Sequence, residues 1–127
     1  MVYKIVAISG SLHKSSVHTG LLKACIELKN SDLQIEIIDI SQFPHLNQDL
    51  LETGKFPPVV QAARERVEKA DAVLFAIPEN NYLVSAPLKN AYDWISMSLN
   101  PAEKPSPLAG KIAGMLSAGA AGGKQAQ

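Results

Sequence analysis

The feature that most constrains the fold is the apolar run at residues 2–8, which changes abruptly to Ser-Gly-Ser at residues 9–11. A short, β-branched apolar run of this kind is typical of a parallel strand buried on both faces. The hydroxyl-rich loop that follows opens a helix near Ser16, where backbone N–H groups lack partners and the helix dipole favours negative charge. We therefore expect residues 9–19 to bind a phosphate group. The alternative is that these serines only cap the helix.

Strand and helix patterns then alternate along the rest of the chain. Such an order folds into a parallel sheet with right-handed crossovers, so we predict one α/β domain over residues 1–127. The loop at 41–57 is long for a compact domain and suggests a functional or interface role. The predicted strands cover 2–8, 33–40, 72–77 and 111–116, and the predicted helices cover 16–28, 57–69 and 86–97.

Composition and charge exclude several classes of protein. Twelve Lys and Arg residues balance twelve Asp and Glu residues, which argues against a nucleic-acid or acidic-membrane partner. Apolar residues make up 46% of the chain, too many for a disordered protein, and no run approaches the ~20 residues of a membrane span. The N-terminus shows no signal-peptide pattern, and a single cysteine suits a reducing compartment, so we expect a cytoplasmic protein. Cys25 shares an apolar helical stripe with Leu21, Leu22 and Leu28, and we interpret it as a core residue.

Three loops should meet at one edge of the predicted sheet. The loops at 9–20, 78–86 and 117–123 each follow the carboxyl end of a strand, where open α/β sheets bind ligands. They are rich in hydroxyl, amide or glycine groups, so we expect one ligand site there. Ser85 is placed to cap the third helix, and the glycine-rich loop is also compatible with simple flexibility.

Common nucleotide, nucleophile and metal motifs do not fit this chain. The first loop lacks the G-x-G-x-x-G pattern of a dinucleotide site, and residues 119–124 have the wrong spacing for a P-loop. There is no G-x-S-x-G nucleophile elbow. His13 and His18 have no cysteine or carboxylate beside them, so we expect no metal site. A single terminal phosphate is the ligand group that these loops suit.

Four segments of the sequence carry a more specific signal. They read SGSLHKSS at 9–16, PENNY at 78–82, SAPLKNAYDW at 85–94 and SAG at 117–119. Together they resemble the NADPH-dependent FMN reductase family, and within it the quinone reductases of the plant and bacterial type. The resemblance covers the whole chain. It implies a flavodoxin-like three-layer α/β sandwich that binds FMN, reduces quinones or free flavin with NAD(P)H, and forms a homodimer or homotetramer.

The resemblance also implies which residues contact FMN. Because the flavin carries out the hydride chemistry, no catalytic side chain is expected. Ser11, His13, Ser16, His18 and Thr19 match the phosphate loop; Pro78, Glu79, Asn80, Asn81 and Tyr82 match the loop beside the isoalloxazine ring; and Ser117, Gly119 and Gly122 match the loop under its pyrimidine end.

The chain departs from the family pattern in several places. His13 stands where the family usually has Arg, His18 where it has Asn, and Asn80 replaces a common aromatic residue. Histidine loses its charge as pH rises whereas arginine keeps it, so we expect the affinity for the phosphate to depend on pH. The family continues after Gln127 with a fifth strand and a last helix. We therefore expect a C-terminally truncated chain with strand order 2-1-3-4, whose fourth strand is an edge.

Two function classes follow from this reading. The first is an FMN-dependent NAD(P)H:quinone oxidoreductase. The alternative is a catalytically impaired relative that keeps the fold and a partner-binding surface but binds flavin weakly or not at all. Large side chains at Tyr92, Trp94 and Met97 also suggest that the third helix and loop 41–57 form a subunit interface, although Trp94 is more simply a core residue.

Overall fold

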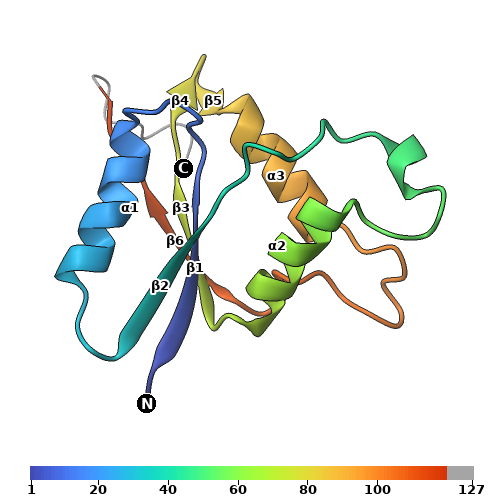
Figure 1. The fold of residues 1–127 in the computed structure, drawn as a ribbon, viewed down its shortest axis with the longest axis horizontal. Helices are drawn as coiled ribbons and strands as arrows, with labels where there is room; N and C mark the ends of the chain where they lie inside the picture. The colour runs from blue at the N-terminus through green and yellow to red at the C-terminus, as the bar shows by residue number, and fades with distance from the viewer. Residues whose placement is uncertain (120–127) are drawn as a thin grey trace.

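The computed structural model describes residues 1–119, and its elements follow the alternating order expected from the sequence (Figure 1). A proline at the first position of α2 sets the backbone angle that a helix requires there. The elements are β1 (Tyr3–Ser9), α1 (Val17–Leu28), β2 (Leu33–Ile38), η1 (Gln48–Leu51), α2 (Pro58–Lys69), β3 (Ala72–Ala76), β4 (Glu79–Asn80), β5 (Leu83–Val84), α3 (Ala86–Ser96) and β6 (Ile112–Leu116).

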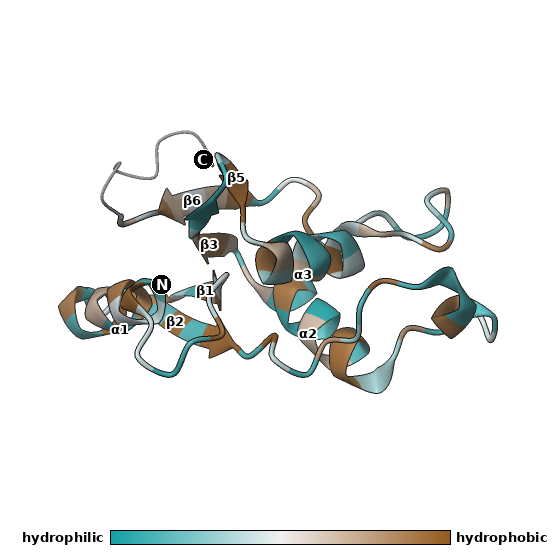
Figure 2. Ribbon diagram, turned by 90° about the horizontal axis from the view of Figure 1, so that it is seen from above, coloured by the Kyte–Doolittle hydropathy of each residue, from teal (hydrophilic) through white to brown (hydrophobic). Residues whose placement is uncertain are grey.

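A parallel sheet of four strands organises the described chain, in the order β2-β1-β3-β6. On β1, Ile5 pairs with Ile35 of β2 on one side and with Ala72 of β3 on the other. Seen from above, α1 lies on one side of the sheet, and α2 and α3 lie on the other (Figure 2). This arrangement confirms the predicted α/β, flavodoxin-like three-layer fold and strand order, with β6 at the edge of the described sheet.

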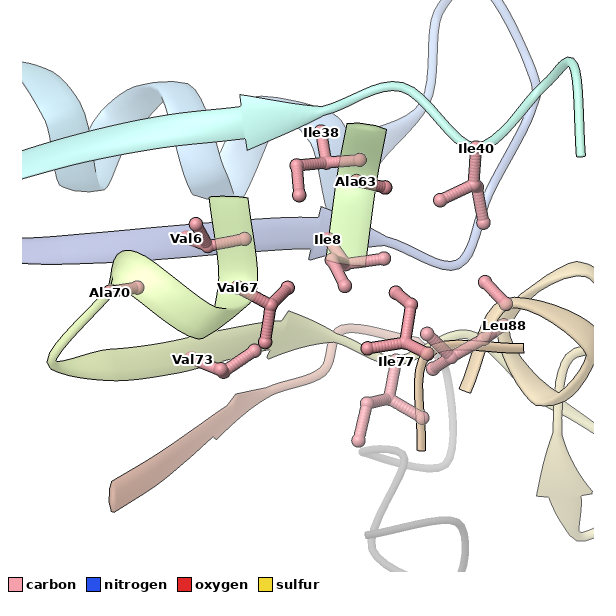
Figure 3. Packing of buried hydrophobic residues seen from close by; sticks show 12 residues of the cluster. Val6, Ile8, Ile38, Ile40, Ala63, Val67, Ala70, Val73, Ile77 and Leu88 are labelled. Atoms are coloured by element: carbon pink, nitrogen blue, oxygen red, sulfur yellow. The ribbon is translucent and has the colours of Figure 1, made fainter. Parts of the chain in front are cut away.

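The larger hydrophobic core lies between the sheet and α2 and α3. Side chains alternate along β1, so Val6 and Ile8 belong to this core whereas Ala7 belongs to a smaller cluster beneath α1. Figure 3 shows Val6 and Ile8 on the same side of the sheet as Val67 of α2. Burying a side chain of this size stabilises the fold by about 1.5–3 kcal/mol. The smaller cluster contains Leu22, which is fully buried.

The predicted apolar stripe of α1 is only partly buried, which corrects the sequence-based expectation. Leu22 is fully buried, Cys25 is half-buried, and Leu28 is 85% exposed. The reason is visible in Figure 1, where α1 diverges from the sheet toward its C-terminal end. Only the first turns of α1 therefore contribute to the core.

A buried arginine joins α2 to the end of α3. Arg64 is 6% exposed, and its Nη1 donates to the carbonyl oxygens of Trp94 at 2.8 Å and Ile95 at 2.6 Å. A cation near the C-terminus of a helix interacts favourably with the helix dipole. The guanidinium also lies 3.8 Å from the centroid of the Phe56 ring. Burial lowers the pKa of Arg64, and the nearby Glu68 carboxylate partly opposes that effect.

Side chains of α3 hold the long loop at 41–57 in place. The Trp94 Nε1–H and the Asn90 amide both donate to the Pro44 carbonyl, at 2.8 and 2.9 Å, and Asn90 accepts a bond from the Leu46 N–H at 2.8 Å. Trp94 is fully buried, which confirms the core interpretation and removes this residue from the expected subunit interface. On the same helix, Tyr92 is 46% exposed.

Two short elements were not predicted: the 3₁₀ turn η1 inside loop 41–57 and the antiparallel pair β4–β5 inside loop 78–86. Each strand of that pair has two residues, too few to produce a visible alternation in the sequence. None of the helices formed by residues 1–119 is long and apolar enough to cross a membrane.

Candidate functional site

The carboxyl ends of β1, β3 and β6 carry three loops to one edge of the sheet, at the top of Figure 1. Beyond the last residue of β1, the Gly10 N–H donates to the Ala76 carbonyl at 2.9 Å. Beyond β3, the Ile77 N–H donates to the Leu116 carbonyl at 2.7 Å. These two bonds continue the sheet ladder into the loops and hold the starts of all three side by side.

The first loop is held by its own hydroxyl groups. Ser9 is 7% exposed, and its Oγ accepts bonds from the Thr19 hydroxyl at 2.9 Å and from the Ser11 N–H at 3.3 Å. Ser16 caps α1, because its Oγ accepts a bond from the Thr19 N–H at 3.2 Å. Internal hydrogen bonds therefore hold the loop in place. Ser16 does cap the helix, as the alternative interpretation supposed, but capping does not use all of the polar groups of the loop.

Several polar groups of this loop face outward. Within residues 1–119, the N–H groups of Val17 and His18, in the first turn of α1, have no protein acceptor. His13 is exposed, and its Nδ1 accepts a bond from the Ser15 N–H at 3.1 Å. Because Nδ1 acts as an acceptor, the imidazole can still donate through Nε2. The loop thus offers donors to an anion at the positive end of a helix.

The second loop forms the hairpin β4–β5, in which Asn80 pairs with Leu83. Its turn residues, Asn81 and Tyr82, have φ values of 52° and 65°, the left-handed region that favours glycine. Tyr82 is 71% exposed and Leu83 is 69% exposed. The hairpin therefore presents two large apolar side chains to solvent from a strained turn, while Pro78 and Glu79 at its base are partly buried.

The third loop is bonded to Ile77, which immediately precedes the second loop, and to His18 in the first turn of α1. The Ser117 hydroxyl donates to the Ile77 carbonyl at 2.7 Å, and the Ala118 N–H donates to His18 Nε2 at 3.4 Å. Gly119 is exposed, and a Cβ added there would meet no atom within 4 Å. The predicted site residue Gly122 lies outside the described residues. All the other predicted site residues lie on these three loops or on the first turn of α1.

Sequence reasoning missed the contact that joins the first loop to the second. A Cβ built on Gly10 would lie 2.7 Å from Pro78 Cδ, 2.8 Å from Ser85 Oγ and 2.9 Å from Leu88 Cβ. The Ser85 hydroxyl donates to the Gly10 carbonyl at 2.7 Å. Ser85 is the N-cap residue of α3, as predicted, but its side chain makes no capping bond. The Ser-Gly-Ser sequence predicted a hydroxyl-rich loop after the first strand, but nothing in it indicated a partner at position 85.

Cavities lie both at this edge and away from it. A cleft of about 330 Å³ borders the first loop, and it includes Ser11, His13 and Thr19. A larger cavity, about 540 Å³, lies between the start of α2 and residues 98–104, and none of the residues that line it belongs to the three loops. No group of three or more metal-binding side chains occurs in residues 1–119.

Residues 3–127 match the model of the NADPH-dependent FMN reductase family. The chain belongs to this family. It is 53% identical over 107 residues to an NADPH:quinone oxidoreductase of Arabidopsis thaliana, an alignment that covers 81% of this chain and 55% of the relative. It is 44% identical over 117 residues to an NAD(P)H-dependent FMN reductase of Pseudomonas aeruginosa, with 92% of this chain and 60% of the relative covered.

One solved structure is similar to nearly the whole of this chain. FerB, a flavoenzyme NAD(P)H:(acceptor) oxidoreductase from Paracoccus denitrificans, has a TM-score of 0.86 and 31% identity, and the match covers 99% of this chain and 67% of the FerB chain. The family expected from the four motifs is thus confirmed. The chain spans 55% to 60% of the length of the two curated relatives described above.

Proposed function

We propose that this chain is an FMN-dependent oxidoreductase that transfers a hydride from NAD(P)H to quinones or to free flavin. The observation that best supports this function is that a phosphate-type loop at 9–19 and a hairpin bearing Tyr82 share one edge of the sheet. The Arabidopsis relative is named as an NADPH:quinone oxidoreductase and the Pseudomonas relative as an FMN reductase. A single phosphate-type loop without a dinucleotide pattern favours FMN over FAD.

The first loop fits a phosphate monoester. The N–H groups of Val17 and His18 would donate to the phosphate oxygens at the positive end of α1. His13 would add a donor from the exposed side, and Ser11 and Ser16 would add hydroxyl groups. The Thr19 hydroxyl donates to the buried Ser9, and Thr19 also lines the cleft of about 330 Å³ beside this loop.

The other two loops would hold the flavin ring. When bound, FMN would supply the hydride chemistry, so the protein needs only to bind, orient and shield it. Backbone N–H groups at this edge would stabilise negative charge near the pyrimidine end of the ring. The residues in this part of the proposal are Pro78, Glu79, Asn80, Asn81 and Tyr82 beside the ring, and Ser117, Gly119 and Gly122 under its pyrimidine end.

The proposal also covers the localisation, oligomeric state and partners of the protein. We place it in the cytoplasm as a homodimer or homotetramer, without a nucleic-acid partner or a resident metal. The half-exposed Tyr92 on α3 provides apolar surface for another subunit.

The test uses purified protein and chromatography of the flavin that it releases. FMN should predominate over FAD, NADH or NADPH should bleach the absorption of the bound flavin under anaerobic conditions, and benzoquinone should restore it. Protein that neither retains nor rebinds FMN would contradict the enzyme and favour the flavin-free relative.

A further inference from the structure

Ser85 holds an unusual position between the two loops of the candidate site. It is 2% exposed, and its hydroxyl donates to the carbonyl of Gly10, 75 residues earlier in the chain, at 2.7 Å. Ser85 also occupies the N-cap position of α3, where a serine normally accepts a bond from the helix backbone. It makes no such bond, so its hydroxyl serves the neighbouring loop in place of its own helix.

The packing between Gly10 and the residues around Ser85 is tight. A side chain at position 10 would come within 3 Å of Pro78, Ser85 and Leu88, so the backbone of the first loop is pressed directly against the base of the hairpin. The Gly10 N–H is bonded to the Ala76 carbonyl, so both peptide groups that flank the Gly10 Cα are held by hydrogen bonds. A shift of either loop must therefore move the other or break the Ser85 bond.

We propose that Ser85 is a positioning residue that couples the phosphate end of the flavin site to its ring end. This inference rests on the proposed function. The phosphate would bind residues 11–19, and the ring would bind residues 78–82. Ser85 lies between these segments: it is bonded to Gly10, directly before the phosphate loop, and it stands at the start of α3, which follows the hairpin. A ligand that spans both loops benefits from a fixed separation between them, whereas a ligand that uses one loop does not.

Riboflavin separates these two cases, because it has the ring of FMN and lacks the phosphate. Wild-type protein and Ser85→Ala are titrated with FMN and with riboflavin by flavin fluorescence. We expect Ser85→Ala to weaken FMN binding about tenfold, the equivalent of one buried hydrogen bond, and to change riboflavin binding by less than about twofold. The matched control is Ser98→Ala, whose hydroxyl also donates to a backbone carbonyl, that of Lys104, away from the three loops. It should leave both affinities unchanged.

A second measurement needs no variant. Inorganic phosphate alone, added to the wild-type protein, should shift the amide NMR signals of the hairpin at 79–84 as well as those of residues 11–19. Shifts confined to residues 11–19 would overturn the coupling, as would a parallel loss of FMN and riboflavin affinity in Ser85→Ala. A wild-type protein that binds neither flavin would overturn the proposed function itself, and the coupling with it.

Discussion

Two loops at the carboxyl edge of the sheet differ in almost every physical property. The first loop, at 9–19, is polar, and its hydroxyl groups bond to its own backbone around the buried Ser9. The hairpin at 79–84 exposes the large side chains of Tyr82 and Leu83, and its two turn residues lie in the left-handed region. One loop is stabilised by local bonds, while the other keeps a conformation that costs free energy.

The difference matches the two ends of the proposed ligand. A phosphate needs many fixed donors, and reorganising them on binding would weaken the interaction. A planar ring needs apolar surface and a defined angle of approach, which a strained, exposed turn can supply. The contact between Gly10 and Ser85 lets these two dissimilar loops act on one molecule.

The largest effect is expected at the point where the loops meet. Gly10→Ala forces a Cβ against Pro78 and Ser85, so the free energy of unfolding should fall by about 3 kcal/mol and FMN binding should be lost. Gly20→Ala is the control, because a Cβ there meets nothing within 4 Å, and alanine in a helix is more favourable by about 1 kcal/mol. Urea unfolding of both variants gives the comparison; effects of the same sign would contradict the close packing.

A smaller effect is expected at the cap of the first loop. Ser16→Ala removes the bond to the Thr19 N–H and should lower the free energy of unfolding by about 1 kcal/mol. Ser16→Asp restores the cap but places a carboxylate beside the proposed phosphate, so stability should return while FMN affinity stays reduced by at least about tenfold. If FMN affinity recovers together with stability in Ser16→Asp, the phosphate does not bind there.

In the hairpin, a substitution in the turn should raise the free energy of unfolding, in contrast to the substitutions above that lower it. Tyr82→Gly creates the Asn-Gly pair that two-residue hairpins favour, and the free energy of unfolding should rise by about 0.5–1 kcal/mol. Tyr82→Ala keeps a Cβ and therefore the strain, so it serves as the matched control and should show no gain. Thermal melting of the three proteins decides the point, and a destabilised Tyr82→Gly would show that the turn is not strained.

The smallest effect concerns the donors at position 13. A guanidinium presents several N–H donors in a fixed fork, whereas the imidazole of His13 offers the phosphate one donor, through Nε2. His13→Arg should therefore tighten FMN binding by about threefold. Fluorescence titrations of the two proteins measure the difference; equal affinities would rule out a contact between position 13 and the phosphate.

The sequence predicted the sheet well, because burial on both faces leaves a strong apolar signal in β1 and β3. It also predicted that loops 9–20, 78–86 and 117–123 meet, since parallel strands end at one edge. It could not predict the β4–β5 hairpin, whose strands are too short to show a period. The roles of Ser9 and Ser85 were also inaccessible, because a hydroxyl in the sequence does not reveal whether its partner is its own helix or a distant carbonyl.

The most direct test of the account is an amide NMR titration of the wild-type protein with FMN. We predict that the signals of residues 11–19, 79–84 and 117–119 shift together with one dissociation constant, while those around the larger cavity, such as Gln61 and Leu99, do not move. Shifts that centre on the cavity beside α2, or shifts in only one of the three loops, would contradict the claim that the loops form a single flavin site.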